Sequence, residues 1–107
     1  FSQGAAWTWT VAMESPDVFH CAAPLSGWIP RSHNDSTHVA RLADQNVNLF
    51  VATGETDSYF NPERVGEYVE LAKGAGVNVE FQTFDAGHEL TDDYAAAVRE
   101  WLQSELE

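Results

Sequence analysis

The sequence predicts an α/β fold with a small parallel sheet, and three observations lead to this class. Helical and strand-like patterns alternate along the 107 residues, which is typical of a parallel sheet flanked by helices. Apart from Asn48, residues 47–53 are apolar or β-branched, as expected of a parallel strand covered on both faces. Asn61 and Pro62 are a strong helix start, and Val65 and Val69 follow them at helical spacing.

The first half of the chain is expected to contain a helix, a strand and a shorter helix. Residues 3–14 are apolar nearly all round, which indicates a buried helix, and Pro16 cannot continue it. Residues 19–26 are a short apolar run and predict the first strand. A polar loop follows, after which Ser36 or Thr37 is expected to cap a short helix.

The second half is expected to contain two strands, each followed by a helix. The helix that begins at Asn61 should end at Gly74 or Gly76. Residues 77–84 alternate between apolar and polar, which predicts a strand near an edge of the sheet. Thr91 is expected to cap the last helix. Its buried stripe is predicted to be Tyr94, Val98, Trp101 and Leu102.

Composition limits the possible partners and compartments. The net charge is −12, from seventeen acidic and five basic residues, so a nucleic-acid partner is not expected. Such a surface keeps a protein soluble, and adaptation to high salt is an open alternative reading. No apolar run approaches the ~20 residues that span a membrane. Cys21 is the only cysteine, which excludes an internal disulfide, and we expect it to be a small buried hydrophobe. A soluble protein is expected; its compartment is left open, with the cytoplasm slightly favoured, and the oligomeric state is not predicted.

The first residues carry a catalytic motif. Phe1-Ser2-Gln3-Gly4 matches the last four residues of G-x-S-x-G, in which a serine occupies a strained turn between a strand and a helix. A serine hydroxyl needs a histidine to accept its proton and an acid to orient that histidine. The sequence offers candidates for both of these partners in later loops.

Asp57 and His88 are the predicted partners of Ser2. Each follows a predicted strand, so both loops should lie at the carboxyl edge of the sheet, where ligands bind in open α/β sheets. The order Ser, Asp, His along the chain is that of an α/β-hydrolase triad. Glu55 is the main rival for the acid, and Asp85 is a weaker one.

Four segments resemble the phospholipase/carboxylesterase family of α/β-hydrolases, which includes the acyl-protein thioesterases. Phe1 to Ala6 resembles its elbow, and Leu25 to Pro30 is similar to its L-S-G-[YWF]-[LI]-P segment. Gly54 to Asp57 and Gly87 to Leu90 are similar to its acid and histidine motifs. Thr53 stands where the family usually has His, so the shape of the leaving-group pocket is uncertain.

The resemblance implies a role for each site residue. Ser2 would be the nucleophile, Asp57 the orienting acid and His88 the general base, with the Gln3 amide as one oxyanion-hole donor. Trp28 either lines the acyl pocket or only covers the sheet.

The resemblance also implies that the chain is part of a larger fold. Residues 1–107 would be a single partial domain, the C-terminal half of an α/β-hydrolase fold with three mainly parallel strands and flanking helices. The strands before the elbow and the second oxyanion donor would be absent, so we expect this stretch alone to be inactive.

The expected function is hydrolysis of a small-molecule carboxylic ester by the parent protein through an acyl-serine intermediate. No cofactor is expected. No metal site is expected either, because His33 and His38 lack a third ligand at close spacing. The remaining alternatives are a serine peptidase, a lactonase, a polyester or feruloyl esterase, and a partial chain that acts only as an interaction module.

Overall fold

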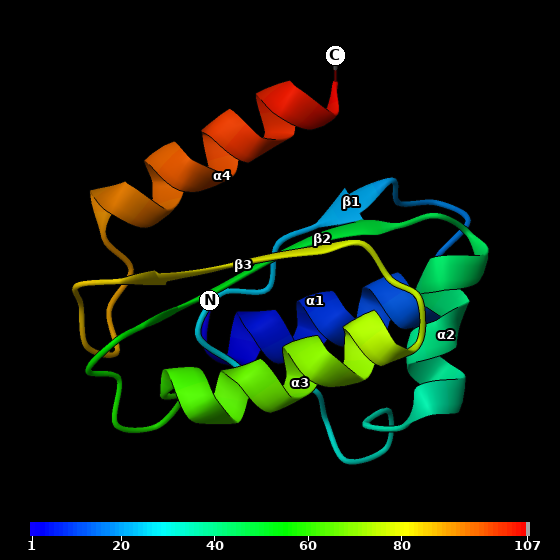
Figure 1. Ribbon diagram of the computed structural model, residues 1–107, viewed down its shortest axis with the longest axis horizontal. Helices are drawn as coiled ribbons and strands as arrows, with labels where there is room; N and C mark the ends of the chain where they lie inside the picture. The colour runs from blue at the N-terminus through cyan, green and yellow to red at the C-terminus, as the bar shows by residue number, and fades with distance from the viewer. Residues whose placement is uncertain (107) are drawn as a thin grey trace.

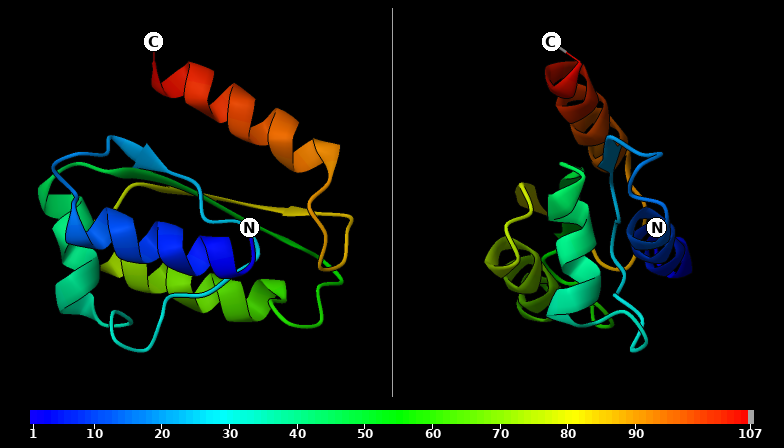
Figure 2. Two further views of the ribbon diagram at one scale, coloured as in Figure 1. Left: turned by 180° about the vertical axis from the view of Figure 1, so that it is seen from behind. Right: turned by 90° about the vertical axis from the view of Figure 1, so that its right-hand side faces the viewer.

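The computed structural model describes residues 1–106 and has three layers, with a parallel sheet between helices (Figure 1). Helices α1, α2 and α3 cover one face of the sheet and α4 lies on the other face, as the rotated views in Figure 2 also show. The predicted α/β class with three parallel strands is confirmed. The elements are α1 (Gln3–Glu14), β1 (Cys21–Ala22), α2 (Ser36–Asp44), β2 (Asn48–Gly54), α3 (Pro62–Gly74), β3 (Val79–Phe84) and α4 (Asp92–Glu105).

The strands lie in the order β1-β2-β3, and β2 is the central strand. Leu49 of β2 is in register with Ala22 of β1 and with Val79 of β3. Every residue of β2 after Asn48 is buried, which agrees with the apolar run in its sequence. Strand β3 lies at one edge, as its alternating pattern predicts.

Strand β1 is shorter than the predicted strand 19–26, and that prediction is wrong in extent. Only Cys21 and Ala22 pair with β2 as a ladder, followed by an isolated bridge at Leu25. Pro24 lies between them and has no N–H to donate. The Leu25 carbonyl also accepts a hydrogen bond from the Ser2 amide, so this segment supports the start of α1.

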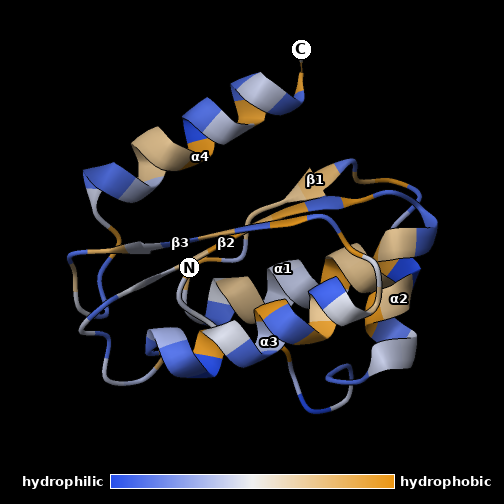
Figure 3. Ribbon diagram, in the orientation of Figure 1, coloured by the Kyte–Doolittle hydropathy of each residue, from blue (hydrophilic) through white to orange (hydrophobic). Residues whose placement is uncertain are grey.

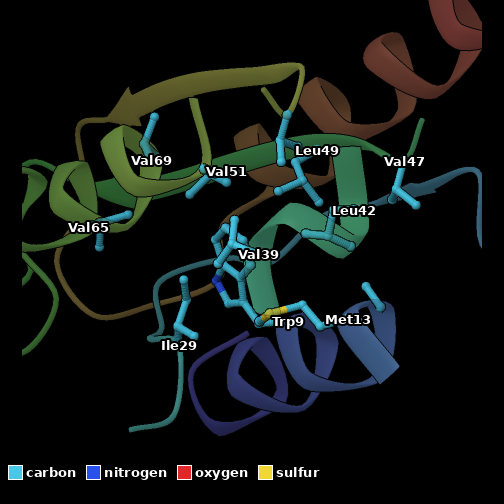
Figure 4. Packing of buried hydrophobic residues seen from close by; sticks show 13 residues of the cluster. Trp9, Met13, Ile29, Val39, Leu42, Val47, Leu49, Val51, Val65 and Val69 are labelled. Carbon is cyan, nitrogen blue, oxygen red and sulfur yellow. The ribbon is translucent and has the colours of Figure 1, made fainter. Parts of the chain in front are cut away.

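The main hydrophobic core lies between the sheet and the three helices on its lower face. Figure 4 shows Trp9 and Met13 of α1 pointing towards Val39 and Leu42 of α2. These side chains are buried, and valines of α3 complete the cluster. At roughly 1.5–3 kcal/mol for each fully buried large apolar side chain, this core is the main source of stability.

A second, smaller core lies between β2 and α4. Phe50 packs against Trp101 with ring centroids 5.6 Å apart, and Tyr94 is fully buried beside it. The predicted burial of Trp101 and Tyr94 is therefore confirmed, whereas Leu102 is 37% exposed. Figure 3 shows that α3 and α4 each carry hydrophobic and hydrophilic residues, as helices with one covered face do.

Two other predictions about burial are wrong. The buried helix predicted for residues 3–14 includes Trp7, which is 63% exposed because α1 turns this residue away from the sheet. Cys21 is only partly buried, since it lies on the edge strand β1. Burial still raises the pKa of the Cys21 thiol, and the nearby Glu105 carboxylate raises it further.

The helix starts show which side chains cap them. Asn61 accepts a hydrogen bond from the Arg64 amide, as predicted for the start of α3. Helix α2 is capped by Asp35 and not by Ser36 or Thr37, because the Asp35 carboxylate accepts from the His38 amide. None of the helices described in residues 1–106 is both long and apolar enough to cross a membrane.

Candidate active site

Ser2 occupies a strained turn directly before α1. Its backbone angles are φ 55° and ψ −120°, in a region that residues with a side chain seldom occupy. The Ser2 amide donates to the Leu25 carbonyl at 2.9 Å, which holds the turn against the segment that follows β1. The turn is therefore fixed by tertiary contact, and a strained residue of this kind is common at active sites.

Gly27 passes directly beneath the turn, where there is no room for a side chain. A β-carbon at Gly27 would lie 2.4 Å from the Ala5 β-carbon and 2.5 Å from the Ser2 carbonyl oxygen. Ser26, just before it, has φ 50° and bends the chain into this position. The small residues around Ser2 thus follow from close backbone approach.

Asp57 and His88 lie in the loops that leave the carboxyl ends of β2 and β3. These loops cross at Gly54, where a β-carbon would lie 2.2 Å from the Ala86 carbonyl oxygen. The Thr56 amide and hydroxyl both donate to the same Ala86 oxygen, at 3.1 and 3.0 Å. The two loops are therefore tied together immediately beside the site.

The structure brings the three predicted residues into one hydrogen-bonded chain. Ser2 Oγ lies 3.0 Å from His88 Nε2, and His88 Nδ1 lies 2.8 Å from Asp57 Oδ2. The Asp57 side chain is fully buried, and its other oxygen accepts the backbone amides of Tyr59 and Phe60 at 2.9 and 2.8 Å. Three hydrogen bonds to one buried carboxylate fix its position and stabilise its charge.

Glu55 and Asp85, the rival acids, are both exposed, and neither has a hydrogen bond to His88. The carboxylate that contacts His88 is that of Asp57. The geometry is that of a nucleophile, a base and an orienting acid.

Aromatic rings surround the imidazole of His88. Phe1 stacks on it with ring centroids 5.0 Å apart, Tyr59 meets it edge-on at 5.3 Å, and Phe60 lies at 5.7 Å. The His88 side chain is 24% exposed. The rings thus restrict both the rotation of the imidazole and its access to water.

A buried hydrogen bond links α4 to Ser26, the residue before Gly27. Tyr94 Oη lies 3.3 Å from Ser26 Oγ, and both residues are buried. Burial is the main cause that raises the pKa of Tyr94, and the carboxylates of Asp57 and Glu89 raise it further, against the effect of the Ser26 hydrogen bond. The phenol therefore stays protonated and neutral near the Asp57 carboxylate.

The Gln3 amide is available as an oxyanion donor. Gln3 is the first residue of α1, so its N–H has no acceptor within the helix. The neighbouring amides of Ser2 and Gly4 are already used, because they donate to the carbonyls of Leu25 and Phe1. The positive end of the α1 dipole adds to the attraction for an anion at this point.

Trp28 lies between the site and a surface hollow. Its ring stacks on Phe60 with centroids 5.3 Å apart, and Phe60 in turn contacts His88. Trp28 also lines a hollow of about 310 Å³ together with Gln3 and Trp7. Trp28 therefore lines a hollow next to Gln3, and its role in an acyl pocket stays a prediction.

A second group of polar side chains lies at the opposite end of α1, and sequence reasoning missed it. Glu14 Oε1 lies 2.6 Å from His33 Nε2, and the His33 ring lies beside that of His38. Glu14, His33 and His38 could together hold a metal ion. The two histidines were considered without Glu14, because only the tertiary packing brings that residue to them.

Comparison with known proteins supports the fold. No protein-family profile matches the sequence, and comparison with curated proteins gave no match. Among solved structures, the chain is similar along its whole length to SOBER1 of Arabidopsis thaliana, with 24% identity and a TM-score of 0.85. It is similar in the same way to acyl-protein thioesterase 2 of Zea mays, with 23% identity and a TM-score of 0.82. A thermostable esterase matches 88% of the chain, with 24% identity and a TM-score of 0.63.

The chain spans about half of the first two proteins, 51% of SOBER1 and 54% of the maize thioesterase, and 23% of the esterase. At these identities the similarity establishes the fold. The chain therefore has a partial α/β-hydrolase fold, and the resemblance predicted from its motifs is confirmed at that level.

Proposed function

We propose that Ser2, His88 and Asp57 hydrolyse carboxylic esters through an acyl-serine intermediate. The observation that carries the proposal is the continuous chain of hydrogen bonds from Ser2 Oγ through His88 to the buried Asp57 carboxylate. Residues of these three types in this geometry activate a serine hydroxyl on several unrelated folds. The similarity to esterase and thioesterase structures supports the same class of reaction.

The reaction has two stages. His88 Nε2 takes the proton of Ser2 Oγ as the oxygen attacks the ester carbonyl, and the resulting oxyanion accepts a hydrogen bond from the Gln3 amide. The C–O bond to the alcohol then breaks as His88 returns the proton to the leaving oxygen. In the second stage His88 removes a proton from water, which attacks the acyl-serine carbonyl. The acyl C–Oγ bond then breaks as His88 returns the proton to Ser2 Oγ, which releases the acid.

We further propose that residues 1–107 are the C-terminal half of the catalytic domain. Within residues 1–106, β1 pairs only with β2, so its other edge is free to accept a further strand. An apolar groove of about 340 Å³, lined by Trp7, Val11 and Phe19, lies beside that edge. A strand at this position would lead into Ser2, and residues before it would supply a second oxyanion donor. Loss of one such donor costs about 10²–10³ in rate, so the isolated chain should be nearly inactive.

Covalent labelling tests the nucleophile. A fluorophosphonate reacts with an activated serine, because the Ser Oγ–P bond forms, fluoride leaves and the histidine takes the hydroxyl proton. We expect the complete protein to be labelled at Ser2, as located by peptide mass spectrometry. Ser32 is the internal control, since its hydroxyl also contacts a histidine, at 2.7 Å from His33 Nδ1, but lies on an exposed loop.

Three variants complete the labelling test. Ser2→Ala and His88→Asn should abolish the labelling, whereas Ser32→Ala should leave it unchanged. A complete, folded protein that is not labelled would contradict the proposal and favour a non-catalytic interaction module. Labelling at Ser32 in place of Ser2 would also contradict it.

A substrate panel then tests the class of reaction. Rates on p-nitrophenyl acetate and butyrate, a matched acyl thioester, a small lactone and a peptide should be highest on the oxygen esters. Hydrolysis of the peptide or lactone alone would show a different hydrolase on the same site. Hydrolysis of the thioester at a much higher kcat/KM than of the ester would assign thioesters as the substrate class.

A further inference from the structure

Glu14, His33 and His38 converge from three separate parts of the chain. Glu14 is the last residue of α1, His33 lies in the loop before α2, and His38 lies in the first turn of α2. Each offers one ligand atom, and these three atoms lie within 4.8 Å of one another. The rings of the two histidines are 4.6 Å apart between centroids. Two imidazoles and a carboxylate are the ligand set of many zinc sites.

The other ring nitrogen of each histidine has a hydrogen-bond partner. His38 Nδ1 donates to Asp35 Oδ2 at 2.7 Å, which fixes its proton on Nδ1 and leaves the lone pair of Nε2 free. His33 Nδ1 lies 2.7 Å from the Ser32 hydroxyl, which can either donate or accept. Histidines that bind metals usually donate their second N–H to a carboxylate or another oxygen in this way.

His33 can change tautomer while Glu14 stays beside its Nε2 and Ser32 stays beside its Nδ1. Its Nε2–H now donates to Glu14 Oε1 at 2.6 Å, because a carboxylate only accepts. A metal ion would bind both of these atoms, and the His33 proton would move to Nδ1, where Ser32 Oγ accepts it. No net proton is lost from the imidazole.

The spacing suits a small divalent ion. Tetrahedral zinc, with bonds of about 2.0–2.1 Å, places its ligand atoms about 3.3 Å apart. The present group has one shorter separation, 2.6 Å between Glu14 and His33, and none above 4.8 Å. The Glu14 side chain is 52% exposed and can move, and Arg41, which lies 3.6 Å from it, is 43% exposed and can move away.

We propose that Glu14, His33 and His38 form a zinc-binding site, with water as the fourth ligand and Asp35 and Ser32 orienting the imidazoles. The site lies at the end of α1 opposite Ser2, about 18 Å away along a helix that rises 1.5 Å per residue. The ion would fasten the loop that carries Trp28, and the start of α2, to the end of α1.

Zinc binding can be measured directly on the full natural protein that carries this chain, after treatment with a chelator. We expect saturable binding of one Zn²⁺ per chain by titration calorimetry, and a higher Tm with Zn²⁺ than with Mg²⁺. Co²⁺ should bind the same site and give visible absorption bands that Zn²⁺ removes. Zn²⁺ should also protect His33 and His38 of the unmutated protein from diethylpyrocarbonate, as mapped by mass spectrometry.

Matched variants identify the ligands. His33→Asn and His38→Asn should each weaken binding more than 100-fold, beyond the roughly 10–100-fold typical of a lost orienting partner. His20→Asn removes an exposed histidine outside the cluster and should leave binding unchanged. Asp35→Asn keeps an oxygen to cap α2 but removes the carboxylate that orients His38, and should weaken binding about 10–100-fold.

Three results would overturn the proposal. These are the absence of saturable Zn²⁺ binding in the folded protein, binding that survives both His33→Asn and His38→Asn, and modification of His33 and His38 at the same rate with and without Zn²⁺. In each case the group would be a hydrogen-bonded cluster that joins α1 to α2 without a metal. None of these results bears on the reactivity of Ser2.

Discussion

Gly54 ends β2 at the point where the loops that carry Asp57 and His88 cross, and Gly54→Ala tests how those loops position the site. The added β-carbon would lie 2.2 Å from the Ala86 carbonyl oxygen and 2.6 Å from that of Gly87. Real β-carbons essentially never approach other atoms closer than 3.0 Å. Both obstacles are backbone atoms, so no side-chain rotation relieves the overlap.

The size of the effect follows from this overlap. The loop that carries His88 must move away from β2 by about 1 Å to reach an ordinary contact distance. A misplacement of about 1 Å in a catalytic group can lower the rate about 10²-fold. Overpacking also costs about 1–3 kcal/mol of folding free energy. We therefore expect kcat for ester hydrolysis to fall about 10²-fold while KM changes little.

The assay compares two glycine-to-alanine variants of the complete protein. Steady-state kinetics on a p-nitrophenyl ester gives kcat and KM, and urea unfolding gives the free energy of unfolding. Gly74→Ala is the control, because Gly74 is exposed at the end of α3 and a β-carbon there would meet no atom within 4 Å. Its kcat should be unchanged, and its stability should rise by up to about 1 kcal/mol.

A Gly54→Ala protein with wild-type kcat and wild-type stability would refute this reasoning. It would show that the two loops can separate without cost to the site. A stable, folded variant with low kcat would support the positional account, since general unfolding would lower stability and activity together.

Two further predictions concern single side chains. Asp57→Asn should lower kcat about 10⁴-fold with the fold retained, because asparagine can still accept the Tyr59 and Phe60 amides but no longer orients the His88 tautomer. Circular dichroism checks the fold and ester kinetics checks kcat. A loss of kcat below 10-fold would count against a triad. Asn61→Ala should cost about 1 kcal/mol of stability, because Asn61 caps α3. Thr91→Val should leave the free energy of unfolding unchanged or raise it by about 1 kcal/mol, since the Thr91 hydroxyl is buried without a partner and does not cap α4. Equal destabilisation by Asn61→Ala and Thr91→Val in urea unfolding would contradict this difference between the two caps.

The order of the elements was predictable because local patterns were strong and agreed with the tertiary structure. Residues 49–52 are apolar on both faces, and β2 is covered on both faces. Asn61 and Pro62 start α3 as predicted, because their cap and fixed φ act locally. Such features need no knowledge of the rest of the chain.

The candidate site was predictable for a related reason. Parallel strands place the loops after their carboxyl ends at one edge of the sheet, so Asp57 and His88 had to lie near each other. The choice of Asp57 over Glu55 could be argued only from motif position. The structure adds the burial of Asp57 and its contact with His88, while the catalytic role of these residues stays a prediction.

Features that depend on packing between distant elements escaped prediction. Trp7 and Trp9 are equally apolar, but the rotation of α1 against the sheet exposes one and buries the other. Glu14 reaches His33 only because α1 and the loop before α2 lie side by side. Beyond the short β1, the Leu25 carbonyl accepts the Ser2 amide from a distant part of the chain, while Leu25 keeps one bridge to Ala52 of β2.

The hydroxyl and the imidazole that meet in the site are separated by 86 residues of sequence. Closing a flexible loop of that length costs about 4 kcal/mol in chain entropy, so we expect this contact to form only once the sheet and its crossing helices bring the two ends together. Long-range contacts of this kind also slow folding. Activity should therefore return during refolding only when the whole topology is complete, and a partly folded intermediate should show no activity in the same assay.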